Sequence, residues 1–359
     1  MSFKNRVISA LLCGAVLLGM TGCTFGKNFG TVATVSGAGK EMTYGDGMYL
    51  YYQFIGYNTA SSALGEDVST KVSDNLKKTV TVGEEEKAFA DVMNESRDQG
   101  FINHAAVDLW FEAEGLTLDA DAKKMITSQA KAGWDQQMKD VLEKNGVSYK
   151  TYEEIITNYY KQQLLFDKFY GPETENLLSD ADLNAAVEAS YMRRTLIRFP
   201  KVTAENKALS EEDLAKVQQL VNSAKEDIAN GTEMAAVVDK YMPEVLKLTT
   251  KAEYTNAADY MVTEYVPFMG ASYPEEQINL LKADAVGGVN SAEGTRTIYC
   301  WQKEDVLKDD ELFRQKKAES ENTARQTDFA AKLQEYQKDF TVSYNEDAVK
   351  YYDPKKIEL

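Results

Sequence analysis

Histidine is scarce in this chain of 359 residues, which contains only one. That residue, His104, cannot build a metal site alone, so we expect it on a helix surface or as a satisfied core residue. A Ser-His-Asp hydrolase would need His104 as its base, and no nucleophile elbow accompanies it. A Walker loop and a dinucleotide fingerprint are also missing. The sequence therefore predicts no metal ion and no cofactor.

Cysteine is scarce as well, with three in the chain. Cys13 lies in an apparent signal segment and Cys23 ends it, which leaves Cys300 without a partner, so no intrachain disulfide is expected. Cys300 lies in a β-prone run and is expected to be a buried strand residue rather than a nucleophile.

Positively charged residues are fewer than negatively charged ones: the chain has 40 Lys and Arg and 57 Asp and Glu, which gives a net charge of −17. Nucleic-acid binding needs a basic face that displaces counterions, so we expect no nucleic-acid partner. The hydrophobic content of 43% supports folded cores, and the length predicts about two domains. Two acidic clusters, 119–121 and 309–311, are either cation ligands or solvated helix starts.

The N-terminus reads as a secretory signal. Lys4 and Arg6 precede an apolar run over 7–20 that is too short to span a bilayer as a mature helix. The run ends in Met20-Thr21-Gly22-Cys23, which resembles the bacterial lipobox. The resemblance implies a signal peptide over 1–22, a lipid anchor with acyl chains such as palmitate on Cys23, and a tether over 23–30. An ordinary signal followed by a chance cysteine is the alternative.

Proline is rare and unevenly placed: none of the six lies before Pro172, and four lie between 200 and 274. Because helix interiors exclude proline, this favours a helical domain over 31–190 and a turn-rich module over 191–305. In the first we expect a strand at 31–37, a helix at 48–57, a polar loop at 58–83 with an extended piece at 79–82, and helices starting at 84, 119–121, 152 and 180.

The central module is expected to mix strands and helices. Strands are predicted at 193–199 and 296–302, and helices at 210–229, 232–241 and 274–282, with a turn-rich stretch before the last helix. A polar helix over 308–338 and a strand at 340–344 follow. A helix with so few apolar positions needs a neighbour, so the segment 306–359 is expected to pack back on the first domain.

The layout and three short motifs resemble the PrsA/SurA group of extracytoplasmic folding factors, whose inserted module is a parvulin-type prolyl isomerase. The motifs are RTLIRF at 194–199, NGTEMAAVVDKY at 230–241, and LKADAVGGV at 281–289 with GTRTIY at 294–299. The resemblance implies an α+β fold with a mostly helical chaperone body and an inserted parvulin-like module. It also implies unfolded or secreted polypeptides as clients, and a location on the outer face of the cell membrane.

The family's two histidines, one in the first and one in the last strand of the module, are absent. The matching positions are Thr195 and Thr297. A prolyl isomerase must bind the twisted amide better than either planar form, which requires polar groups around that amide. We therefore expect a chaperone that binds chains without catalysis. The alternatives are a surface-anchored assembly module for one protein partner, and an isomerase that works with threonine hydroxyls.

Aromatic and methionine residues are the best binding candidates, because such side chains suit promiscuous contact with unfolded chains. One cluster runs from Tyr49 to Tyr57. The second, our candidate peptide-binding set, comprises Tyr260, Met261, Tyr265, Phe268 and Met269. For both clusters core packing is the alternative.

Overall fold

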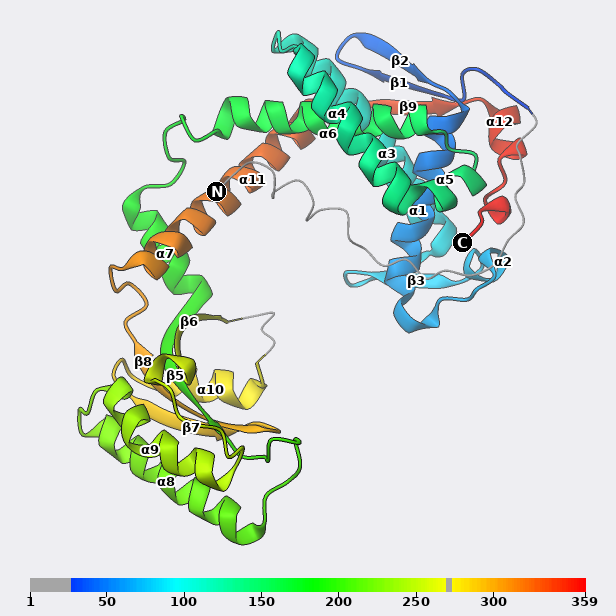
Figure 1. Ribbon diagram of the computed structural model, residues 1–359. Coiled ribbons are helices and arrows are strands. Elements are labelled where there is room, and N and C mark those ends of the chain that lie inside the picture. Colours follow the sequence, from blue (N-terminus) through cyan, green and yellow to red (C-terminus); the bar gives the residue numbers. More distant parts are fainter. Residues whose placement is uncertain (1–26, 269–272) are drawn as a thin grey trace. The chain divides into compact units, whose positions relative to one another are not determined.

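The computed structural model describes residues 27–268 and 273–359 and divides into two compact units (Figure 1). A helical unit comprises the chain up to Thr174 together with Thr327–Leu359, and a sheet unit comprises Glu175–Gln326. The expected α+β class is confirmed. Cys23 and Met269, with the whole predicted signal peptide, lie outside the described residues. Within the described residues no helix has both the length and the apolar character needed to cross a bilayer.

The first and last strands of the chain pair with each other in the helical unit. β1 (Ala33–Gly37) lies between β2 (Lys40–Tyr44) and β9 (Thr341–Tyr344), antiparallel to both. Val35 stands opposite Met42 on one side and Val342 on the other. Residues 33–44 and 341–344 are therefore held in one sheet, with α12 (Glu346–Tyr351) and the short turn η6 (Pro354–Lys356) beyond it.

Long helices form the body of this unit around a core rich in aromatic side chains. The long helices are α1 (Asp46–Leu64), α3 (Phe89–Ala113), α4 (Ala120–Gly133) and α6 (Tyr149–Tyr170). The π-turn η4 (Trp134–Met138) and the short helix α5 (Lys139–Lys144) lie between α4 and α6 in the sequence. Side-chain caps fix two of the starts: Asp119 accepts from the Ala122 amide at 2.7 Å, and Ser148 accepts from Thr151 at 3.3 Å. The cluster 119–121 is thus a helix start.

Two local expectations for this unit are wrong. The stretch 58–83 is not mainly loop, because α1 continues to Leu64 and is followed by η3 (Gly65–Asp67) and α2 (Val72–Asn75), whereas the extended piece expected at 79–82 is present as β3 (Thr79–Val82). The acidic run 84–86 does not open a helix. Gly83, with a φ of +65°, turns the chain into β4 (Glu85–Ala88), which pairs with β3, and α3 starts only at Phe89.

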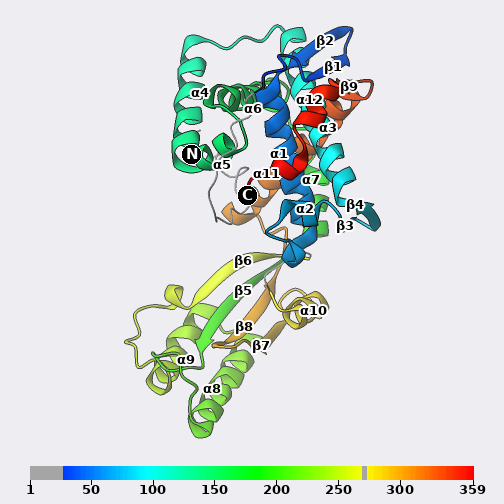
Figure 2. The same cartoon turned by 90° about the vertical axis from the view of Figure 1, so that its right-hand side faces the viewer.

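The sheet unit is a four-stranded antiparallel sheet with helices on both faces (Figure 2). After α7 (Asp180–Ser190), β5 (Tyr191–Pro200) lies between β6 (Met261–Pro267) and β8 (Thr297–Glu304), and β7 (Val289–Glu293) borders β8. α8 (Glu211–Ala229) and α9 (Met234–Leu248) share a core with Ile197 and Phe199 of β5. α10 (Glu275–Ala283) packs with Leu196 and Trp301 on the opposite face.

This unit departs from expectation in three elements. α9 continues past Tyr241 and through Pro243 because Met242, Val245 and Leu246 bury a continuous apolar face, which outweighs the hydrogen bond that proline cannot donate. β6, preceded by η5 (Ala257–Asp259), and β7 occupy stretches read from the sequence as turns. Their few alternating apolar residues gave little signal.

The last long helix, α11 (Glu311–Gln337), crosses the division between the units. Its C-terminal part enters the core of the helical unit through Phe329 and Leu333. There the ring of Trp110 stacks against Phe329 at 5.5 Å and against Tyr336 at 5.6 Å between centroids. This packing gives a polar helix the neighbour that it requires.

Candidate functional site

The candidate site lies on β5, the strand that separates the two cores of the sheet unit. Successive side chains of a strand point to opposite faces. Arg193, Thr195 and Ile197 therefore share the face covered by α8 and α9, whereas Arg194 and Leu196 share the face covered by α10. The consecutive arginines Arg193 and Arg194 thus place one charge on each face, and the apolar residues Ile197 and Leu196 do the same.

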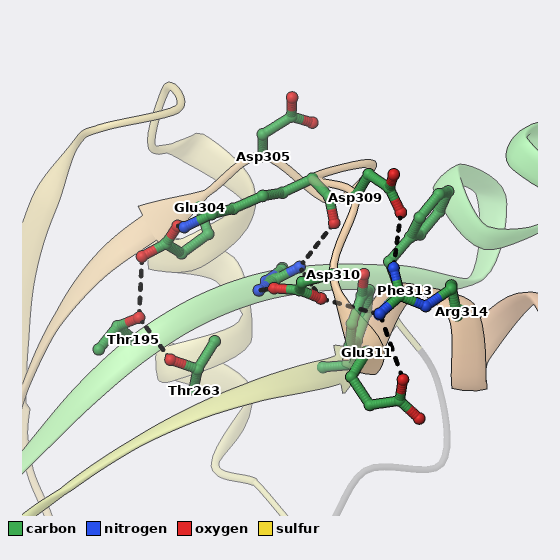
Figure 3. Close-up of polar contacts among 12 residues, drawn as sticks. Thr195, Thr263, Glu304, Asp305, Asp309, Asp310, Glu311, Phe313 and Arg314 are labelled. Carbon is green, nitrogen blue, oxygen red and sulfur yellow. Dashed lines mark hydrogen bonds and ion pairs between the residues drawn. The ribbon is translucent and has the colours of Figure 1, made fainter. Parts of the chain in front are cut away.

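Thr195 is 5% exposed and its hydroxyl is fully engaged (Figure 3). Its Oγ1 donates to Oε1 of Glu304 at 2.8 Å and lies 2.9 Å from Oγ1 of Thr263 on the neighbouring strand. Since Thr195 gives its single proton to Glu304, Thr263 is the donor in the second bond. The proton of Thr195 is thus committed to a carboxylate within the protein.

The sheet does not bring Thr297 to Thr195. Thr195 stands opposite Gln302, and Thr297 stands opposite Pro200, five positions further along β5. Five residues of strand correspond to roughly 17 Å. Because successive side chains alternate between the two faces, Pro200, five positions after Thr195, lies on the opposite face. Thr297, which stands opposite Pro200, is therefore on the α10 side of the sheet. The two hydroxyls therefore cannot act on one peptide bond.

Two residues before Thr195, on the same face of β5, Arg193 is 2% exposed and forms an ion pair with Asp310. Its Nη1 donates to Oδ1 of Asp310 and to the carbonyl of Lys308, each at 3.1 Å. The same Asp310 oxygen accepts from the Phe313 amide at 3.1 Å, and so caps α11. The guanidinium of Arg193 lowers the pKa of Asp310 to about 2.

The neighbours of Asp310 complete the start of α11 rather than a cation site. Asp309 and Glu311 pair with Arg314 at 3.2 and 3.3 Å. Among the described residues, no group of three or more histidine, cysteine, aspartate or glutamate side chains is arranged to hold a metal ion. The cluster 309–311 is therefore a helix start.

A second ion pair occupies the opposite face of the sheet. Arg194 is 1% exposed, and its Nε and Nη2 donate to Oε1 of Glu264 at 3.0 and 2.8 Å. Its guanidinium lies 5.1 Å from the ring centre of Tyr273 and 5.4 Å from that of Trp301. The hydroxyl of Tyr273 donates to the other oxygen of Glu264 at 3.1 Å. Both faces of the central strand thus carry a buried arginine that is paired with a carboxylate.

The candidate peptide-binding residues do not gather on one surface. Tyr260 and Met261 pack against the core beneath α8 and α9, and Phe268 packs against the core beneath α10. The hydroxyl of Tyr265 donates to the Val306 carbonyl at 2.7 Å. All four are half-buried. Tyr260, Met261 and Phe268 therefore border the two cores, and peptide binding by this set stays a prediction. The Tyr49 to Tyr57 cluster is likewise buried, in the core of the helical unit.

His104 and Cys300 are both buried structural residues. The Nδ1 atom of His104 is hydrogen-bonded to the hydroxyl of Tyr52 at 2.8 Å, and burial lowers its pKa to about 4. Burial raises the pKa of the Cys300 thiol to about 12, so this thiol stays protonated at neutral pH.

The sequence did not identify Glu264 and Glu304 as partners of the β5 residues. A usable signal was present, because two consecutive arginines in a strand bounded by apolar residues place one charge on each face, and a buried charge requires a partner. Which acidic residues supply the partners depends on strand register, which the sequence leaves open.

Comparison with known proteins finds similarity among solved structures. No model of a known protein family and no curated protein matches the chain. The chain is similar over most of its length to the foldase protein PrsA from Streptococcus pneumoniae, with 15% identity, a TM-score of 0.28, and coverage of 72% of this chain and 90% of that one. For PrsA from Lactococcus lactis the identity is 12%, the TM-score 0.32, and the coverage 91% and 98%. Function therefore rests on the chain's own residues.

Proposed function

We propose that this protein is a membrane-anchored extracytoplasmic chaperone of the PrsA/SurA type, which binds unfolded or secreted polypeptides without isomerising prolyl bonds. The observation that carries the proposal is the layout of the chain. A sheet unit interrupts a helical unit whose first and last strands, β1 and β9, pair with each other. This is the layout that the sequence motifs imply for a folding factor.

The polar groups of the central strand support binding without catalysis. An isomerase must present hydrogen-bonding groups around a single twisted amide. In this protein Thr195 is committed to Glu304, Arg193 is paired with Asp310, and Thr297 belongs to the other face. This arrangement supports binding without catalysis, because these groups of β5 and β8 do not converge on one prolyl bond.

The test of chaperone function uses chain 24–359 without lipid and reduced, unfolded lysozyme as client. At an equimolar ratio we expect the protein to suppress the light scattering of the aggregating client. No suppression would contradict the proposal. Recovery of one stoichiometric partner in place of many secreted chains would favour the alternative of a dedicated assembly module.

The test of catalysis is a prolyl-peptide isomerisation assay with the same protein. The expected rate equals the uncatalysed rate. An acceleration that Thr195→Val abolishes would show that a threonine-based isomerase is present. Thr297→Val serves as the matched control, because Thr297 lies on the opposite face of the sheet.

Anchoring through Cys23 is tested separately. Each buried methylene of an acyl chain contributes about 0.8 kcal/mol to membrane residence, so two or three chains anchor a protein firmly. We expect mass spectrometry of membrane-extracted protein to find a diacylglycerol-modified Cys23 at the mature N-terminus. We also expect Cys23→Ala to prevent both lipidation and membrane retention.

A further inference from the structure

The outer edge of β6 is an open row of backbone hydrogen-bonding groups. Phe268 donates its amide to the Ser190 carbonyl at 3.0 Å, and Arg198 donates to the Tyr260 carbonyl at 2.9 Å. In an antiparallel ladder such bonded pairs alternate with pairs whose groups point the other way. Met261, Thr263 and Tyr265 therefore direct their amides and carbonyls away from β5, and among the described residues none of these groups has a backbone partner.

The opposite edge of the same sheet is protected. On β7 the outward amide of Ser291 is taken by the side-chain oxygen of Asn290 at 2.9 Å. Glu293 at the end of that strand binds Lys201 and Gln218, each at 2.8 Å. Proteins commonly protect an edge strand with capping groups and charges. Among the described residues no side chain caps an outward amide of β6 as Asn290 caps that of Ser291, and the one charged side chain of β6, Glu264, is held by Arg194 on the α10 face of the sheet.

We infer that β6 binds an extended segment of client polypeptide as a fifth, antiparallel or parallel strand of the sheet; this inference rests on the proposed chaperone function. Outward amides and carbonyls recur about every 6.8 Å along a strand, and only another extended backbone matches that spacing. Main-chain pairing is indifferent to the client's sequence, as promiscuous binding requires. The row of donors ends at Pro267, which has no amide hydrogen.

Charge favours a client over a second copy of this chain. Two copies, each with a net charge of −17, repel one another when their edges approach. A neutral or cationic client meets no such barrier, and reduced lysozyme, which is cationic, is therefore a suitable probe.

Hydrogen exchange in the unaltered protein is the first test. When reduced lysozyme is added to saturation, we expect the amides of Met261, Thr263 and Tyr265 to exchange about tenfold more slowly, since each gains a hydrogen bond. The amides of Val262 and Glu264 already face β5 and serve as internal controls with unchanged exchange. Unchanged exchange at all five amides, while the protein suppresses aggregation, would overturn the inference and leave the proposed function standing.

Thr263→Pro is the second test, because proline removes one outward donor and is tolerated on an edge strand. Thr263→Val is the matched control, which loses the hydroxyl bond to Thr195 and keeps the amide. We expect Thr263→Pro to bind reduced lysozyme about fivefold more weakly than Thr263→Val. If Thr263→Pro and Thr263→Val both fold and bind reduced lysozyme equally well, the inference is overturned. It is also overturned if the unaltered protein and Thr263→Val self-associate and Thr263→Pro does not. Failure of the unaltered protein to bind the client would contradict the proposed function itself.

Discussion

At the scale of single residues, the buried arginines of β5 make the strongest demands on the sheet unit. Replacing Glu264 by Leu leaves the guanidinium of Arg194 buried without its counterion, and removing one partner of a buried pair costs about 3–5 kcal/mol. We expect Glu264→Leu to lower the free energy of unfolding by this order, and Arg194→Met with Glu264→Leu to restore much of it. Urea denaturation of the three chains measures both effects.

An exposed ion pair in the same unit provides the control. Lys216 and Glu212 lie 2.7 Å apart with side chains 51% and 80% exposed. Solvent screens such exposed pairs and they contribute little, so Glu212→Gln should leave the unfolding midpoint almost unchanged. If Glu264→Leu were equally neutral, the Arg194 pair would not be the buried anchor described above.

His104 predicts a specific pH dependence. Burial lowers its pKa from 6.5 to about 4 in the folded protein, with Asp108 opposing this shift and Lys161 adding to it. Between these values the unfolded chain binds the extra proton, so stability is highest above pH 6.5 and falls as the pH drops towards 4. From pH 7 to pH 5 this residue should account for a loss of about 2 kcal/mol in the free energy of unfolding. Urea denaturation of the unaltered protein and of His104→Gln at both pH values measures the difference, and an identical pH dependence would contradict the assignment.

The residue scale also shows what the sequence could not decide. A buried Cys300 and a structural His104 follow from composition and local pattern, and the structure agrees. The separation of Thr195 from Thr297 does not follow from the sequence. The register between two strands decides which residues share a face, and a shift of one residue moves each side chain to the other face. The motifs place both threonines in the first and last strands, but motifs carry no register.

At the scale of elements, the second half of α11 depends on a stack of rings. Phe329 is buried beside Trp110, Phe166 and Tyr170. Phe329→Ala should lower the free energy of unfolding of the helical unit by about 3–5 kcal/mol, because it leaves a cavity against those rings. Val82→Ala, at an exposed hairpin position, should change it by less than about 0.5 kcal/mol. Thermal or urea unfolding followed by tryptophan fluorescence measures both, and equal small effects would contradict the packing described here.

Elements with strong local signals were predictable. α7 and α8 follow Ser179 and Ser210, whose hydroxyls accept from amides three residues later. α7 starts at the expected residue 180, and α8 matches its expected range closely. The strands β2, β4, β6 and β7 were missed. They are four to seven residues long, and their polar or mixed sequences acquire strand geometry through partners elsewhere in the chain.

At the scale of the whole molecule, the helical unit should require the chain's last segment. A chain ending at residue 326 lacks β9, Phe329 and α12, and so loses the strand that pairs with β1 and part of the aromatic core. We expect this truncated chain to lose the cooperative unfolding transition of the helical unit, whereas a fragment comprising 175–326 should unfold cooperatively by itself. Circular dichroism and hydrogen exchange on both chains test this, and a native-like transition of the helical unit in the truncated chain would contradict it.

The pairing of Ala33 with Tyr344 has a consequence for biogenesis. A polypeptide is synthesised from its amino end, so β1 can pair with β2 at once, but its other edge must wait for β9 while about three hundred further residues appear. Unpaired strand edges are prone to aggregate. The sheet unit can finish folding during that interval, because in the sequence all of its strands come before the second segment of the helical unit, Thr327–Leu359. A protein proposed to shelter nascent chains thus passes through a long period in which one edge of β1 is exposed.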